Sequence, residues 1–267
     1  MSAPKKAKLT AADVADVKSN FLGMAAEEEI KSEPSFSDHV TTAQATDALL
    51  LSMETVLLSA IKSTDTGGML LPRLGSNPTQ IRFVFNSENR LPMMSRVVNQ
   101  KIWEEVQGLL KLKSTQGLSI TGPQGIGKSH ALYFCVCVLR LFRSKVRVTY
   151  LQSCEEWVKS HGDVPYIFLL RELCETFMDD EISTGDKKTI ADWAEWVLDA
   201  RPKEREERFQ ELHLVLNAFV KAKKLRWISV FDQENGLHSD RLGMTIAGVH
   251  AAKHYPFNLA GTFSEKV

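Results

Sequence analysis

Residues 118–142 read LSITGPQGIGKSHALYFCVCVLRLF, and this stretch decides the fold. It opens with a short apolar run at 118–121, passes through a glycine-rich turn and ends in an almost wholly apolar segment at 128–142. The pattern predicts a strand, a tight turn and a buried helix, in that order. Further along, apolar runs at 146–151 and 227–231 alternate with helical stretches, which is typical of a parallel sheet covered by helices.

The glycine-rich turn matches the phosphate-loop pattern G-x-x-x-x-G-K-[ST]. Its residues are Gly122, Pro123, Gln124, Gly125, Ile126, Gly127, Lys128 and Ser129. A polyphosphate has to be wrapped by backbone N–H groups, and glycine allows the backbone to come close and to turn through positive φ. The helix that starts near Lys128 directs its unpaired N–H groups and its positive dipole end at the same place.

These residue types predict a nucleoside-triphosphate site with Mg²⁺. We expect Lys128 to contact the β and γ phosphates and the hydroxyl of Ser129 to reach a bridging Mg²⁺. His130 follows directly and belongs to the predicted nucleotide-binding set. ATP is the expected nucleotide, because the sequence contains no evident guanine-reading motif.

A triphosphate site also needs a carboxylate for the magnesium shell, and residues 228–232, ISVFD, are an apolar run that ends in Asp232. Many ATPases place a glutamate directly after this aspartate to activate water. Here Gln233 stands at that position and Glu234 comes next, on the same face of an extended strand as Asp232. Either Glu234 is the base, or Gln233 orients water without taking its proton, so we expect binding rather than fast turnover.

Four further residues are weaker candidates. A last strand is predicted at 257–263, and Thr262 near its end is placed to touch the γ phosphate between the two motifs. Arg201, Arg226 and Arg241 are candidates to supply charge from a neighbouring subunit, although solvation at the surface is the default for each.

The whole chain is expected to be an α/β protein of the P-loop NTPase class, with three αβα layers and a mainly parallel sheet. Residues 1–42 are expected to be a disordered leader, 43–89 a helical region and linker, and 90–267 the P-loop domain. Within these ranges we expect a helix at 43–63, a linker at 64–80, a strand at 81–85 and an amphipathic helix near 98–110. Because the sequence stops soon after its last predicted strand, either 81–85 covers the edge of the first strand, or the domain is truncated or pairs with a partner.

Composition excludes several function classes. Thirty-three basic residues balance thirty-three acidic ones, so no overall field favours nucleic acid or an anionic membrane. The longest apolar run, 48–61, is too short and too interrupted to span a bilayer. The four cysteines form no CxxC pair and are expected to be buried thiols in a reducing, intracellular compartment. The sequence leaves open a protein partner or a second copy of the chain.

Three stretches together resemble one family. They are GPQGIGKSH at 122–130, YLQSCEEW at 150–157 and VFDQEN at 230–235, and they are similar to the P-loop domain of the Crinkler proteins and the related retrotransposon hot spot proteins. The resemblance covers roughly residues 90–264 and implies an ATPase module of effectors that act inside host cells, commonly in nuclei. The first sixty residues contain no LxLFLAK-like leader motif, whereas the cluster Lys5-Lys6-Ala7-Lys8 is compatible with nuclear import.

Two other interpretations use the same loop. A phosphotransferase would need an acceptor pocket with a carboxylate base and a basic lid, and Asp163 and Arg171 fall in a plausible region. A non-hydrolysing interaction module would bind protein partners through the helical stretch 164–222.

Overall fold

A computed structural model of the chain describes nine ranges of residues. They are 34–62, 68–75, 83–94, 96–111, 118–120, 126–154, 164–183, 186–232 and 258–261. The chain divides into two units, residues 1–35 and residues 36–267. Every described helix and strand belongs to the second unit.

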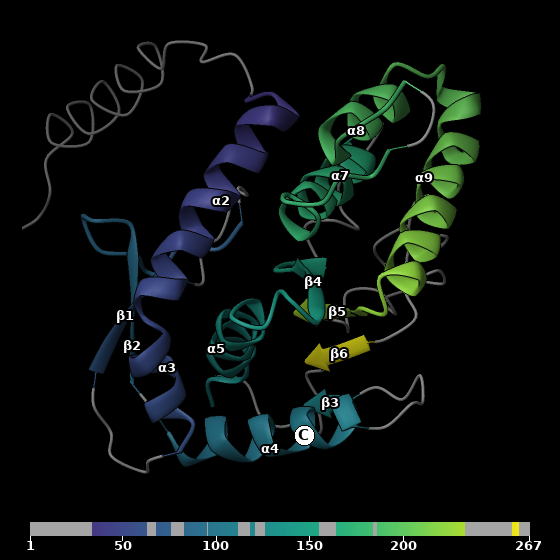
Figure 1. The fold of residues 1–267 in the computed structure, drawn as a ribbon. Helices are drawn as coiled ribbons and strands as arrows, with labels where there is room; N and C mark the ends of the chain where they lie inside the picture. The colour runs from purple at the N-terminus through teal and green to yellow at the C-terminus, as the bar shows by residue number, and fades with distance from the viewer. Residues whose placement is uncertain are drawn as a thin grey trace, which may run out of the picture. The chain divides into compact units, whose positions relative to one another are not determined.

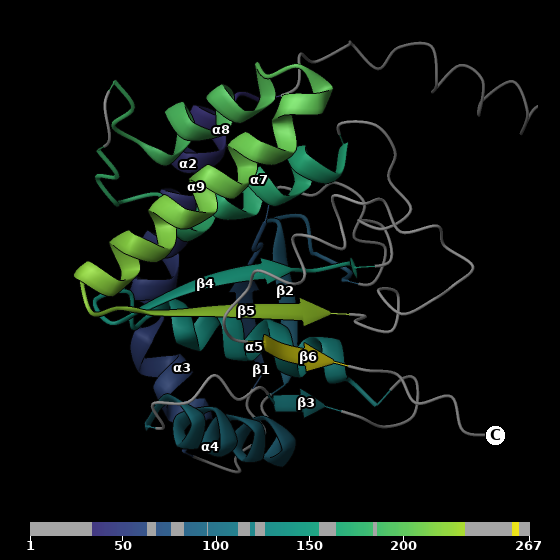
Figure 2. The ribbon, with the colours of Figure 1, turned by 90° about the vertical axis from the view of Figure 1, so that its right-hand side faces the viewer.

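The centre of this unit is a four-stranded parallel sheet. Its strands are β3 (Leu118–Ile120), β4 (Val146–Leu151), β5 (Arg226–Asp232) and β6 (Asn258–Gly261), in the order β3-β6-β5-β4. Figure 2 shows the four arrows pointing the same way, as the parallel pairings require. Strand β6 therefore lies between β3, which precedes the glycine-rich stretch in the sequence, and β5, which ends in Asp232.

The sequence of β4 and β5 explains why helices cover both faces of the sheet. All six residues of β4 and all but the first of β5 are buried, which requires packing on each side. Alternate residues divide between two apolar cores. Val148, Tyr150 and Val230 pack in the first core, whereas Leu151 and Phe231 pack in the second.

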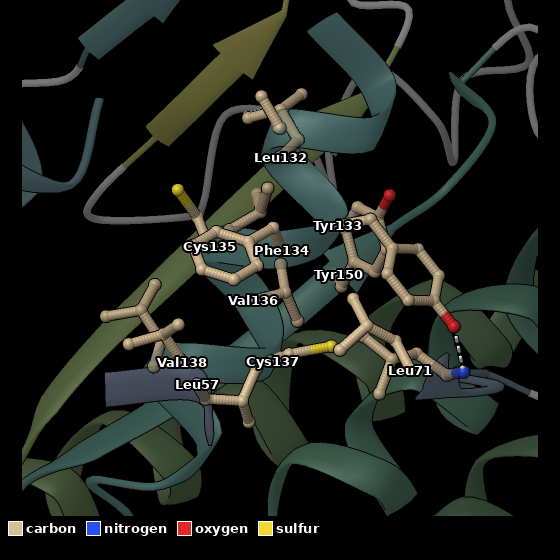
Figure 3. Packing of buried hydrophobic residues seen from close by; sticks show 14 of the residues in the cluster. Leu57, Leu71, Leu132, Tyr133, Phe134, Cys135, Val136, Cys137, Val138 and Tyr150 are labelled. Atoms are coloured by element: carbon tan, nitrogen blue, oxygen red, sulfur yellow. Dashed lines mark hydrogen bonds between the residues drawn. The ribbon is translucent and has the colours of Figure 1, made fainter. Parts of the chain in front are cut away.

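The first core lies under helix α5 (Lys128–Arg140), which packs directly on the sheet (Figure 1). Helices α3 (Glu54–Ala60) and α4 (Val97–Lys111) pack against α5. Strands β1 (Gly68–Pro72) and β2 (Arg90–Met94) form a separate antiparallel pair beside them. Figure 3 shows apolar side chains of α5, with Leu57 of α3 and Leu71 of β1 packed against them. This close packing holds the start of α5 in place.

The second core lies under α7 (Val164–Thr176), α8 (Ile190–Leu198) and α9 (Pro202–Ala222). Helix α8 begins with a capping box, in which Thr189 and Asp192 each bond the other's backbone N–H. Helix α2 (Phe36–Ser52) contacts α7 and α8 as well as β1 and α5. These contacts tie the two helical layers together past the β4 edge of the sheet.

The strands predicted at 118–121, 146–151, 227–231 and 257–263 and the helix predicted at 128–142 are confirmed, with described bounds that agree within two residues of the predictions. Upstream, the disordered leader expected at 1–42 is wrong over residues 36–42, because helix α2 already begins at Phe36. The single helix expected at 43–63 is two helices, α2 and α3, which are separated at Met53. The prediction of a linker at 64–80 is wrong for residues 68–72, which form strand β1. The strand predicted at 81–85 is also wrong for its described part, since residues 83–85 are irregular and cover no edge of the parallel sheet.

Two expectations from composition can be compared with the described residues. All four cysteines are buried thiols, as predicted, and burial raises the pKa of the Cys135 thiol to about 12. Among the helices that the structure describes, none combines the length and the apolar character needed to cross a membrane.

Candidate functional site

The start of α5 and the end of β5 meet at the carboxyl edge of the parallel sheet. Ser129 donates a hydrogen bond from its Oγ to Oδ1 of Asp232 over 3.0 Å, although the two residues are 103 positions apart. The alternation along β5 explains this contact, because Ile228, Val230 and Asp232 face the α5 side of the sheet. The described residues of the two sequence motifs are therefore in direct contact.

Glycine is required at the turn into α5. Gly127 is the residue before the helix and adopts φ +88°, which L side chains rarely tolerate. A Cβ at this position would also lie 3.1 Å from Nη1 of Arg96. The carbonyl of Gly127 accepts the first helical hydrogen bond, from the N–H of Ala131 over 3.0 Å. The N–H groups of the first turn consequently point out of the helix towards the sheet edge.

The site combines opposite charges in a buried setting. Asp232 is 1% exposed and Lys128 is 6% exposed, while Ser129 is half-buried. In a low-dielectric environment each charge acts more strongly on a ligand than it would in water. A cation, a hydroxyl and a carboxylate at the amino end of a helix are a suitable set for a phosphate chain with its metal ion.

Tyr150 on β4 lies on the same face of the sheet and was not among the residues selected from the sequence. It is paired in register with Val230 and is buried. Burial and the negative charge of Asp232 raise its pKa well above the usual value, so the phenol stays protonated. The sequence signal that would have found it is its place one residue before the end of β4, beside the strand that carries Asp232.

His130 and Arg96 stand next to the glycine turn. Burial, and then the positive charge of Arg96, lowers the pKa of His130, so its imidazole is neutral near pH 7. The edge of Phe83 packs on the His130 ring, with 5.2 Å between ring centroids. Arg96 precedes α4, and its carbonyl accepts the N–H of Asn99 over 2.9 Å. Sequence patterns missed Arg96 because it is distant from both motifs along the chain.

Several predicted residues lie outside the described part of the chain. Gly122, Pro123, Gln124 and Gly125 of the loop are among them, as are Gln233, Glu234, Thr262, Asp163 and Arg241. Their assigned roles stay predictions. Ile126 is described and is exposed beside Gly127. Arg226 begins β5 at the end opposite to Asp232, and Arg201 precedes α9, so neither belongs to the Ser129–Asp232 site within this chain.

The residues at the site fit Mg²⁺ better than a transition metal. In the described part of the chain, no three His, Cys, Asp or Glu side chains gather into a cluster that could hold a metal ion. The Oγ of Ser129 and the Oδ1 of Asp232 lie 3.0 Å apart, and both are hard oxygen ligands of the kind Mg²⁺ prefers. Mg²⁺ usually takes few protein ligands and completes its shell with water and phosphate oxygens.

Comparison with known proteins adds no assignment. The chain matches no family model, and no curated protein is detectably similar to it. Evidence for function therefore comes from the site itself.

Proposed function

We propose that this chain is a P-loop NTPase that binds ATP with Mg²⁺ and acts as a slow ATPase or a nucleotide switch. The observation that carries the proposal is the hydrogen bond between Ser129 and Asp232, which joins the two motifs at the carboxyl edge of the sheet. Sheet order also supports it, because β3 and β5 lie on either side of β6, and ligands of open α/β sheets bind at the carboxyl ends of the strands.

Each described residue has a defined part in this proposal. The N–H groups at the start of α5 and the ammonium of Lys128 bind the phosphates. Ser129 offers its oxygen to Mg²⁺ while its proton stays bonded to Asp232, and Asp232 holds metal-bound water. When bound, Mg²⁺ neutralises charge on the phosphate oxygens.

The rate of hydrolysis depends on the two residues directly after Asp232. Gln233 and Glu234 are the two candidates, for orienting water and for accepting its proton. Because glutamine stands where many ATPases have glutamate, we propose that nucleotide binding is much faster than turnover.

The proposal also covers the family to which the chain belongs and the place in the cell where it acts. We place the chain with the Crinkler-like ATPase modules, which implies action inside a host cell and in its nucleus. The support is that two of the three family-like stretches end neighbouring strands, at Leu151 of β4 and Asp232 of β5. Exclusion of a tagged chain from the nuclei of host cells would count against the nuclear role.

The test is ATP affinity measured by calorimetry with Mg²⁺ present, for the native chain and for Lys128→Ala. Loss of a charged hydrogen-bond donor costs about 1.5–3 kcal/mol, so affinity is expected to fall by well over tenfold. Lys145→Ala is the matched control, because this exposed lysine lies beyond the other end of α5. Equal affinity of the native chain and Lys128→Ala would rule out the site.

Turnover then separates the three interpretations of the loop. Phosphate release without an acceptor supports the ATPase, and transfer to an acceptor supports a phosphotransferase. ATP binding with neither reaction supports a switch or an interaction module that uses 164–222.

A further inference from the structure

A cavity of about 630 Å³ lies beside the start of α5 and is not used by the phosphate site. Gly127 and His130 line one side of it. Met69 of β1 and Met93 and Met94 of β2 line another side, and the register of the hairpin brings them together, because Met69 pairs with Met93 and Gly68 with Met94. The volume is in the range of small-molecule sites.

Two more polar side chains of the cavity come from Arg96, directly before α4, and from Asn99 in its first turn. Arg96 and Asn99 both line it, and the backbone hydrogen bond from Asn99 to Arg96 fixes their spacing. Asn99 is 3% exposed, so its amide is held inside the protein rather than in solvent. Arg96 reaches the glycine turn, where its Nη1 would lie 3.1 Å from a Cβ at position 127. The cavity thus borders Gly127, the residue directly before α5.

We propose that this cavity binds the adenine nucleoside of the nucleotide whose phosphates lie at the start of α5. The inference rests on the function proposed above and extends it to the base. Flat aromatic rings pack well on methionine side chains, which are polarizable and adapt their shape. The amide of Asn99 offers a donor and an acceptor together, the pattern that matches the edge of adenine.

The lining also discriminates against guanine. Guanine presents adjacent N–H donors, for which a carboxylate is the matched acceptor. The described residues that line the cavity include no aspartate or glutamate. Among the same residues, Arg96 adds donors instead, and the ring of His130 is suited to stacking against the base or the ribose. The chemistry of the wall therefore favours ATP over GTP.

The experiment compares two ligands in Mg²⁺ buffer, ATP and inorganic tripolyphosphate. Tripolyphosphate has the phosphate chain but lacks a base. The test variant is Leu70→Ser with Met94→Ser, because both residues line the cavity and are 42% and 55% exposed, so the fold tolerates the change. ATP affinity is expected to fall about tenfold and tripolyphosphate affinity to stay the same. The matched control is Leu51→Ser with Leu214→Ser, two exposed leucines on α2 and α9.

The two proposals fail in different ways. If the native chain binds neither ligand, both proposals are wrong. If it binds both ligands but the cavity variant weakens them equally, or weakens neither, the phosphate site stands and the base pocket is overturned. Asn99→Asp adds a carboxylate of the same size and is expected to lower the ratio of ATP to GTP affinity, and an unchanged ratio would contradict the assignment.

One measurement needs no variant. Photolabelling of the native chain with 8-azido-ATP and peptide mapping should place the label within 68–70, 92–99 or 127–130, the segments that line the cavity. A label confined to other peptides would overturn the pocket.

Discussion

The two ends of helix α5 carry similar charges in different surroundings. At the carboxyl end, Arg140 is ion-paired with Asp47 at 2.6 Å and with Glu175 at 3.3 Å, and Arg143 contacts Asp47 and Asp179. At the amino end, Lys128 and Ser129 face the sheet edge where Asp232 ends β5. The first group links α2, α5 and α7 to one another, whereas the second lies where the helix dipole attracts an anion.

A buried cation therefore does not by itself mark a binding site. Arg140 is as buried as Lys128, at 7% and 6% exposed. Burial lowers the pKa of Arg140, but Asp47 and Glu175 outweigh it and raise the pKa overall, so the guanidinium is used inside the fold. What distinguishes the two cations is their position: Lys128 lies at the amino end of α5, next to the carboxyl ends of the strands, whereas Arg140 lies at the other end of the helix.

The largest expected effect is on stability, at the carboxyl end. Arg140→Ala leaves the carboxylates of Asp47 and Glu175 buried without the guanidinium between them, which typically costs about 3–5 kcal/mol. Urea unfolding measures the loss, and Arg201→Ala at an exposed position is the control, expected within about 0.5 kcal/mol of the native chain. ATP affinity of the folded variant should not change. A stability loss below about 1 kcal/mol would mean that the buried ion pairs contribute little.

The next effect is on binding, at the amino end. Asp232→Asn keeps an oxygen that can accept the hydrogen bond of Ser129 but removes the negative charge near the metal ion. We expect ATP affinity in Mg²⁺ to fall by about 1.5–3 kcal/mol and affinity in EDTA to change little. Calorimetry in the two buffers checks this, with the exposed Asp186→Asn as control. Equal losses in both buffers would show that Asp232 acts on the fold and not on the metal ion.

A smaller effect is expected from the glycine turn. Gly127→Ala forces φ +88° on an alanine and brings its Cβ to 3.1 Å from Arg96, so stability should fall by about 1–2 kcal/mol. Gly108→Ala in α4 is the matched control, because a Cβ there meets nothing within 4 Å. In a helix interior this change should stabilise by about 0.5–1 kcal/mol. Thermal unfolding measures both, and changes of the same sign at both glycines would contradict the assigned turn.

The amino end of α5 was predictable from sequence because its signals are local. The phosphate-loop pattern fixes the turn, and the apolar run that ends at Asp232 fixes the strand, so parallel pairing is enough to bring Ser129 and Asp232 to one edge. The same holds for β4, whose β-branched and aromatic residues Val146, Val148 and Tyr150 alternate along the predicted strand.

The rest depends on contacts that are distant in sequence. Gly68 and Pro72 gave β1 the composition of a linker, yet it pairs with β2 at the margin of the fold, where proline is tolerated. Asp47 resembled a surface residue of an amphipathic helix, and only the packing of α2 on α5 makes it the partner of Arg140. Arg96 is connected to the site solely by the approach of α4 to the start of α5.

The smallest expected effect tests whether the carboxyl end of α5 is purely structural. Glu172 on α7 is buried near Arg140, and burial, then the charge of Glu175, raises its pKa well above 4.5. Above pH 4.5 the unfolded chain therefore binds fewer protons than the folded one at this residue, so stability falls as the pH rises through the pKa of the folded state. Glu172→Gln cannot ionise and should flatten this decline.

Unfolding free energies from about pH 5 to about pH 8 measure the slope, with the exposed Glu211→Gln as control. The stability of the native chain and of Glu211→Gln should change with pH in parallel, while Glu172→Gln becomes relatively more stable towards the alkaline end. Glu175 titrates in the same direction, since burial raises its pKa too, so some decline should persist in the variant. A difference in stability between the native chain and Glu172→Gln that stays constant over this range would mean that Glu172 is ionised in the fold throughout it and that Arg140 serves three carboxylates instead of two.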